Sequence, residues 1–337
     1  MATIKDIAAR LGVSISTVSK GLNGASDISE ELRQTVLDTA VEMGYSTKRS
    51  RKVENRKLAL FIENMNYESI DEFGYDVGLG FKQNAFKHKW DVDIIPVTPQ
   101  LQAEEKYDTY ILKNGYCGAF LVGFALHDEW MQQLKNTTMP TVLFDNYIEN
   151  NPNVAYVGTD SYEGIDMAVK HLHNLGHKKI AFINGSLFSL VSDQRQEAFE
   201  NSMRDAGLEI YPELMGHGYY IPETAQYYVS NFIAAGATAI LCGSDAIAKG
   251  VISECQLHGF NVPNDISVVG FDDVKFAAAL TPPLTTVRQE CNDLGRCAYI
   301  ILNSLIHHIP ISRTQLRPRL IERESTARVS TAHAAEE

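Results

Sequence analysis

The stretch ATIKDIAARLGVSISTVSKGLNG, residues 2–24, places two short helical patterns on either side of a glycine. Apolar residues recur at helical spacing over 4–11 and predict a first helix there. Gly12 ends that helix, and Ser14 is a good N-cap for a second helix over 15–22. We therefore expect two helices joined by a tight turn, which is the core of a helix-turn-helix unit.

A third apolar series begins at Ser29 and ends before Gly44, and it predicts a helix that covers the first two. Val18 and Leu22 face this small core, so the other side chains of the second helix point outward. We predict that three of these reach base edges: Ile15, Ser16 and Lys20. Short polar side chains suit phosphate oxygens, and we predict that four of them bind the DNA backbone: Ser14, Thr17, Ser19 and Asn23. Thr3, which caps the first helix, is assigned to the DNA-binding residues as well. The same pattern also fits a three-helix bundle with a polar surface that never touches DNA.

Charge is distributed unevenly along the chain. The net charge is −12, yet residues 1–57 carry ten Lys/Arg against seven Asp/Glu. A basic N-terminal part on an acidic body indicates that only this part meets DNA. The 337 residues suit two or three compact units, and no apolar run is long enough to span a bilayer. The N-terminus lacks a signal-peptide core and the five cysteines form no CxxC pair, so we expect a cytoplasmic protein with free thiols.

The body alternates short apolar runs with amphipathic helical stretches, which predicts parallel sheets covered by helices. The runs fall into two similar series, so we expect an α/β body of two doubly wound parallel-sheet lobes. The first series is KLALFIEN (57–64), WDVDIIPV (90–97), GAFLVGF (118–124) and PTVLFDN (140–146). The second is 178–185, 216–220, 238–244 and 266–273, with helices over 195–207, 223–235 and 246–258.

Several motifs at characteristic spacing point to one family. Besides the opening stretch they are SEELRQTV (29–36), EMGY (42–45), LGHKKIA (175–181), GSDAIAKG (243–250), VPNDISVVGFDD (262–273), LTTV (284–287) and REST (323–326). In this combination the chain resembles the lac repressor family of bacterial transcription regulators. The resemblance implies an N-terminal all-α helix-turn-helix head and a periplasmic-binding-protein-like body with an effector between its lobes. It also implies crossovers near Gly158, Val287 and Leu316, and a homodimer on a pseudo-palindromic double-stranded operator.

We expect four parts: 1–45 as the DNA-binding domain, 46–57 as a basic linker, 58–330 as the effector-binding and dimerisation domain, and 331–337 as a disordered tail. The linker departs from the family pattern, because it lacks the proline and the leucine of the usual hinge helix. We interpret it as a basic arm, including Arg49 and Arg51, that orders on phosphates, with Val53 as its one apolar candidate for a minor-groove wedge. The alternative is a solvated, disordered linker.

Polar residues follow the predicted strands, where open α/β sheets bind ligands. By the resemblance, Asp145, Arg195, Ser244 and Asp272 match ligand-contacting positions, and these carboxylates and the guanidinium suit a polyhydroxyl ligand. Tyr220 would stack on that ligand, and Phe73, in the loop after the first strand, is a weaker candidate for the opposite wall. The alternatives are a plain turn at Asp145, a structural ion pair at Arg195 and a loop role for Asp272. For Asp245 we favour a helix cap.

The sequence gives little support for a metal site or a catalytic site. His171, His173 and His177 do not share a helix face, so we expect no metal site, and no cofactor is implied. No nucleophile with a poised base is recognisable, so we expect no enzyme. The leading interpretation is a sequence-specific DNA-binding transcriptional regulator, a repressor, controlled by a small effector such as a saccharide. The alternatives are a cytoplasmic sugar-binding sensor without a DNA role and a cleft enzyme.

Overall fold

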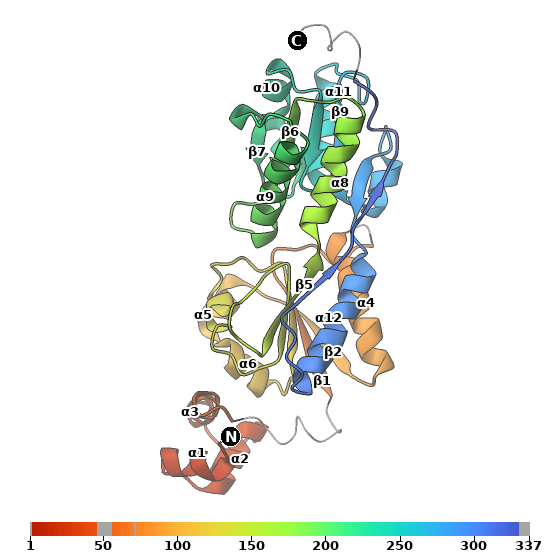
Figure 1. The fold of residues 1–337 in the computed structure, drawn as a ribbon. Helices are drawn as coiled ribbons and strands as arrows, with labels where there is room; N and C mark the ends of the chain where they lie inside the picture. The colour runs from red at the N-terminus through yellow and green to blue at the C-terminus, as the bar shows by residue number, and fades with distance from the viewer. Residues whose placement is uncertain (1, 46–55, 71, 330–337) are drawn as a thin grey trace. The chain divides into compact units, whose positions relative to one another are not determined.

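The computed structural model describes residues 2–45, 56–70 and 72–329, and Figure 1 traces the chain. The chain divides into two compact units, each assembled from separate stretches of sequence. The first unit comprises Met1–Met65, Val77–Val157 and Asn292–Thr314. The second comprises Asn66–Asp76, Gly158–Cys291 and Gln315–Glu337. The chain therefore changes units at Gly158, within two residues of Leu316 and within five of Val287, close to the three predicted crossovers.

The N-terminal region consists of three helices, as predicted: α1 (Ile4–Leu11), α2 (Ile15–Asn23) and α3 (Glu30–Glu42). Gly12 follows α1 with φ +66° and Gly24 follows α2 with φ +69°, a left-handed conformation that glycine adopts at little cost. Side chains from all three helices meet in a closed core, and Ile7, Val18 and Leu37 are fully buried there.

The first six-stranded sheet has the order β11-β5-β4-β3-β1-β2, and its pairs from β5 to β2 are parallel. Phe61 packs against Trp130, with ring centroids 5.1 Å apart, and Phe120 packs against Phe81 of α4. The strands are β1 (Lys57–Ile62), β2 (Asp91–Pro96), β3 (Ala119–Val122), β4 (Thr141–Phe144), β5 (Val154–Thr159) and β11 (Arg313–Leu316). The accompanying helices are α4 (Phe73–Lys87), α5 (Pro99–Glu104), α6 (Tyr107–Lys113), α7 (Glu129–Gln133) and α12 (Cys291–Ile306).

The second six-stranded sheet repeats this plan with the order β12-β10-β9-β8-β6-β7, in which only the β10–β12 pair is recorded as antiparallel. Its strands are β6 (Ile180–Asn184), β7 (Met215–His217), β8 (Ala239–Cys242), β9 (Ser267–Asp272), β10 (Thr285–Arg288) and β12 (Arg319–Ile321). Its α-helices are α8 (Ser161–Asn174), α9 (Leu190–Asp205), α10 (Val229–Ala234) and α11 (Asp245–Leu257). Three 3₁₀ helices complete it: η2 (Pro212–Leu214), η3 (Pro222–Tyr227) and η4 (Lys275–Ala279).

Alternation along the strands explains why helices cover both faces of the second sheet. On β6, Ile180 and Phe182 join the core beneath α8 and α9, whereas Ala181 and Ile183 join the core beneath α10 and α11. Figure 1 shows α8 and α9 together over one face of this sheet. The predicted doubly wound α/β body is therefore confirmed.

Three local predictions need correction. Tyr220 lies beyond the strand predicted over 216–220, because β7 ends at His217. The helix predicted over 223–235 is η3 followed by the short α10, since Pro222 opens a tighter turn. Phe73 does not lie in a loop but is the first residue of α4. In the described part of the chain, none of the helices combines the length and apolar character that a membrane crossing requires.

Candidate functional site

Helix α2 presents a polar, exposed face. Ile15 is 49% exposed, and Ser16 and Lys20 are also exposed, while Val18 on the other side of the helix is fully buried. The helix therefore places the three predicted base-reading side chains on its outer face. The Lys20 ammonium forms an ion pair with Asp27, which follows α2. A base contact by Lys20 would have to replace this pair.

The predicted phosphate-binding residues lie at the start and along the side of α2. Ser14 is its N-cap, and its hydroxyl accepts the Thr17 N–H at 3.0 Å and lies 2.8 Å from the Thr17 hydroxyl. Asn23 donates to the Ser19 carbonyl at 2.7 Å. Thr3 caps α1 in a reciprocal pair with Asp6, as expected for a capping box. Thr3 and Ser14 thus lie at the N-terminal ends of α1 and α2, where anions are favoured, whereas Asn23 lies at the C-terminal end of α2.

The positive charge of the N-terminal part does not come from the three helices. Residues 2–45 contain four Lys/Arg and six Asp/Glu, whereas residues 46–57 contain six Lys/Arg and one Glu. Attraction to phosphates must therefore come mostly from the linker. Arg49, Arg51 and Val53, the predicted DNA contacts of the linker, lie outside the described residues.

A polar cluster occupies the carboxyl edge of the second sheet. Arg195, on α9, is 3% exposed; its guanidinium donates to the Gly243 carbonyl at 2.6 Å and lies 3.8 Å above the Phe271 ring. Asp272, at the end of β9, accepts from the Gln289 amide at 2.7 Å. Arg195 is thus held by a carbonyl and an aromatic ring, and no ion pair is recorded for it within the described residues.

The turn that carries Asp272 is strained and firmly held. Asp272 has φ +118° and Asp273 has φ +55°, conformations that non-glycine residues adopt at a cost. Asp273 is clamped by Arg288 at 2.6 Å and Arg323 at 2.7 Å. Strained backbone that is held in place by ion pairs is typical of functional sites, where the orientation of one side chain must be fixed.

Burial raises the pKa of Asp272 to about 6, although the neighbouring Arg195 charge acts to lower it. Asp245 lies beside it, fully buried, and burial together with the Asp272 charge raises the pKa of Asp245 well above its ordinary value. Asp245 accepts from the Thr286 hydroxyl at 2.5 Å and from the Val274 N–H at 2.9 Å. Two carboxyl groups with raised pKa values at one sheet edge are a recognised mark of a functional site.

The helix cap predicted at Asp245 is wrong, because Ser244 caps α11 instead. Ser244 is the N-cap of α11 and accepts the Ile247 N–H at 3.2 Å. Asp245 does not cap the helix, because its carboxylate is turned into the core, against Gly270 of β9. Tyr220 lies over Gly185, and its hydroxyl is 2.6 Å from the Ser192 hydroxyl.

Gln289 is a site residue that sequence reasoning missed. Its amide nitrogen binds Asp272, while its buried Oε1 has no partner among the described residues. The Nε of Arg195 is likewise buried without a partner there. One donor and one acceptor thus remain available beside a carboxylate. The available signal was a polar residue two positions after the LTTV motif (284–287), a stretch that the apolar pattern did not mark as a strand.

In the first unit, Asp145 directly follows β4 with φ +54°. The next residue, Asn146, is 6% exposed and donates to the Phe124 carbonyl at 2.5 Å. Asp145 therefore lies at the carboxyl edge of its sheet, as predicted. Its neighbour Asn146 is hydrogen-bonded to the connection that follows β3.

Comparison with known proteins identifies the family of the chain. Residues 3–48 match the bacterial regulatory proteins of the lacI family, and residues 169–326 match the periplasmic binding protein-like domain. The chain is 30% identical over 343 residues to the HTH-type transcriptional repressor PurR of Haemophilus influenzae (strain ATCC 51907 / DSM 11121 / KW20 / Rd), covering 96% of this chain and 98% of that one. The chain belongs to the lacI family.

Solved structures of lacI-family proteins share the fold. One is a complex of the transcriptional regulator CelR with cellobiose, at 25% identity and a TM-score of 0.73, covering 96% of this chain and 100% of that one. Another is the lac repressor dimer bound to operator and the anti-inducer ONPF, at 20% identity and a TM-score of 0.68, covering 97% and 99%. The protein is therefore a DNA-binding transcriptional repressor with an effector-binding body, and not an enzyme.

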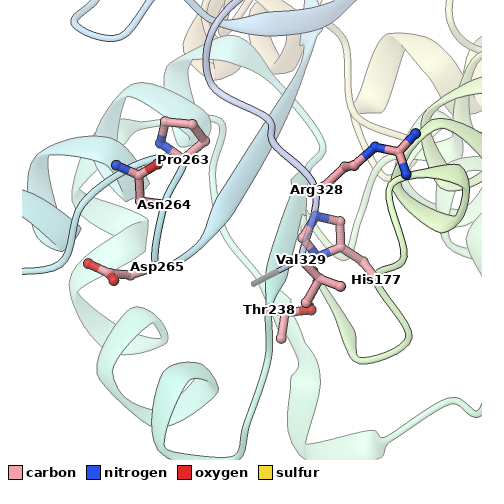
Figure 2. Close-up of a pocket in the computed structure, with 7 residues that line it drawn as sticks. All are labelled: His177, Thr238, Pro263, Asn264, Asp265, Arg328 and Val329. Atoms are coloured by element: carbon pink, nitrogen blue, oxygen red, sulfur yellow. Dashed lines mark hydrogen bonds between the residues drawn. The ribbon is translucent and has the colours of Figure 1, made fainter. Parts of the chain in front are cut away.

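The histidines that suggested a metal site hold the C-terminal segment in this lacI-family protein. His177 lies 2.9 Å from the Thr238 hydroxyl and 3.0 Å from the Ala327 carbonyl, and His171 lies 3.0 Å from the Thr326 hydroxyl. No cluster of metal-binding side chains occurs in the described ranges. Figure 2 shows a pocket lined by His177, Thr238, Pro263, Asn264, Asp265, Arg328 and Val329. His177, Thr238 and Asp265 precede β6, β8 and β9, so the pocket lies at the amino ends of these strands.

Proposed function

We propose that the protein is a homodimeric repressor whose operator affinity is set by a small polyhydroxyl effector, such as a saccharide. The proposed effector ligands are Arg195, Asp272 and Asp145. We add Gln289 to the predicted set of Phe73, Tyr220 and Ser244. The observation that carries the proposal is the cluster of Arg195, Asp272 and Gln289, in which Arg195 and Gln289 are buried.

The cluster has the chemistry that a hydroxyl group needs. A hydroxyl both donates and accepts, so one hydroxyl can accept from the unpaired Arg195 Nε–H and donate to the unpaired Gln289 Oε1. A second hydroxyl of the same ligand can donate to the Asp272 carboxylate. Leaving buried polar atoms unpaired costs about 1–3 kcal/mol each, and a bound ligand would remove that cost. The cellobiose bound by CelR, a relative of similar fold, is a ligand of this class.

On the DNA side, we propose that residues 1–45 form the DNA-binding domain and that Ile15, Ser16 and Lys20 read bases. Thr3, Ser14, Thr17, Ser19 and Asn23 bind phosphates there. The basic linker, 46–57, supplies most of the electrostatic attraction, and residues 58–330 form the effector-binding and dimerisation domain. The outward face of α2 and the charge difference between helices and linker support this division.

Exposed aromatic surface supports the homodimer. The stretch after β7 carries Tyr219 at 74%, Ile221 at 45% and Tyr227 at 69% exposure. Within it, η3 packs closely on α11, where the Pro222 carbonyl lies against Gly250. A rigid, exposed patch rich in tyrosine is typical of protein interfaces. We assign it to a second copy of this chain, because the related lac repressor is a dimer on its operator.

Selection of binding sites from genomic DNA with the purified protein tests the proposal. We expect enrichment of a pseudo-palindromic DNA site. Binding of the protein to this site should then weaken or strengthen when the effector is among saccharides that are added one at a time. Arg195→Ala should abolish that response without changing the enriched sequence. Enrichment of a single half-site would contradict the homodimer. A palindrome that responds to no hydroxylated compound would contradict the proposed effector class.

A further inference from the structure

The first sheet carries a pair of carboxyl groups, one of them buried, that the proposed effector site does not use. Glu63 directly follows β1 and is 3% exposed. Its carboxyl group interacts with that of Asp128, the residue before α7. Gln102 places the two residues side by side, because its side chain binds both Glu63 and the Trp130 N–H at the start of the same helix. The strand order reverses between β1 and β3, so Glu63 and the connection after β3 flank the point where open α/β sheets place their ligands.

Hydrogen-bond directions define what the neighbours present to these two carboxyl groups. The Trp130 N–H can only donate, and it lies 3.0 Å from Gln102 Oε1, so the amide nitrogen of Gln102 faces Glu63. That nitrogen donates to Glu63 Oε2 at 2.7 Å. Asp128 Oδ2 accepts the Ala125 N–H at 2.6 Å. One oxygen of each carboxyl group is therefore occupied as an acceptor, and a bond between the two groups requires a proton.

The pair is connected to Asp145 through one short segment. Asp128 closes the connection 123–128 by binding the Ala125 N–H, and Phe124 in the same connection accepts from the Asn146 side chain. Asn146 is the neighbour of Asp145. A displacement of the connection 123–128 would therefore be transmitted to Asp145 by a single hydrogen bond and one peptide unit.

We propose that Glu63 and Asp128 share a single proton, and that this proton holds the connection 123–128, and with it Asp145, in the position that the effector requires. The inference rests on the proposed effector role of Asp145. It makes Glu63 a positioning residue, and it makes effector binding weaken as the shared proton is lost.

The chemistry of the pair places this loss near neutral pH. Burial, as the larger cause, and the adjacent Asp128 raise the pKa of Glu63 from 4.5 to about 7. Asp128 and the uncharged Gln102 are the groups that act on the Glu63 carboxyl; His127 and Glu129, which flank Asp128, are exposed. Loss of the proton leaves two carboxylates in contact, and like charges at this range repel strongly.

Hydrogen–deuterium exchange of the full-length protein at pH 6 and pH 8.5 tests the proposal without any effector. In Glu63→Gln the amide mimics the protonated acid, because it donates to Asp128 and accepts from Gln102. Relative to this variant, we expect exchange at 123–128 and 145–146 in the wild type to accelerate about tenfold between the two pH values, since the opened segment returns Glu63 to its ordinary pKa. Glu68→Gln, which changes an exposed glutamate after the same strand, is the control and should follow the wild type.

Each outcome decides a separate point. Equal pH dependence in the wild type and Glu63→Gln would overturn the shared proton, and acceleration confined to 123–128 would overturn the positioning of Asp145. Asp128→Asn should also remove the pH dependence, so it serves if Glu63→Gln does not fold. Neither result bears on whether Asp145 binds the effector, which a separate loss of effector response in Asp145→Asn would show.

Discussion

Replacing Asp272 with asparagine should stabilise the protein at neutral pH. Asp272 has a pKa of about 6 in the folded protein, raised by burial from an ordinary 3.8. The folded state therefore holds this proton more tightly than the unfolded chain, so stability is greatest below the ordinary pKa and falls as pH rises through the folded pKa. Asp272→Asn removes this loss, because an amide does not ionise.

The magnitude follows from the size of the shift. One pKa unit corresponds to about 1.4 kcal/mol, so the gain in unfolding free energy grows from about 1 kcal/mol at pH 4.5 to at most about 3 kcal/mol at pH 7.5. The amide keeps the bond from Gln289, and asparagine tolerates the positive φ of this turn as well as aspartate does. The effector response should be lost, because a neutral amide cannot replace the carboxylate.

Urea unfolding of both proteins at pH 4.5, 6 and 7.5, followed by circular dichroism, measures this difference. Asp273→Asn is a matched control in the same turn. It breaks the ion pairs with Arg288 and Arg323 and should destabilise the protein by about 3–5 kcal/mol. A gain for Asp272→Asn that does not change with pH, or a loss at pH 7.5, would refute the reasoning.

Three further changes test the DNA and effector sites. Lys20→Ala should cost about 1–3 kcal/mol of operator affinity at one base position, measured with single-base operator variants; a uniform loss would make Lys20 a phosphate contact. Arg195→Ala should abolish the effector response and leave operator affinity near normal in the same assay, whereas unfolding would assign it a purely structural role. Replacing the four basic residues within 48–52 by glutamine should reduce the slope of log operator affinity against log salt concentration by about 3–4. An unchanged slope would show that the linker does not contact the DNA backbone.

Features set by nearby residues were predictable from sequence. Helix α2 was expected over 15–22 and spans Ile15–Asn23, because its cap and its terminating glycine are adjacent in the chain. The doubly wound body followed from apolar runs of strand length. The carboxyl-edge positions of Asp145 and Asp272 then followed from where those runs ended.

Features that depend on distant partners were not predictable. Asp245 is buried because Thr286, 41 residues away, donates to it from β10, a strand that the apolar pattern left unassigned. Gln289 was missed for the same reason, since it follows that strand. Glu63 ended an apolar run and looked like a strand residue, while its partner Asp128 lies far along the chain. Two carboxyl groups can be recognised as a pair only when the fold brings them together.

The interleaving of the two units constrains how this protein can diversify. Each unit is built from three separate stretches of chain, so no single crossover between genes can replace one unit intact. The helix-turn-helix region, 2–45, is one uninterrupted stretch, and one recombination event can exchange it. New operator preferences can thus be inherited as a block, whereas a new effector preference must accumulate through individual substitutions in a body that has to keep folding.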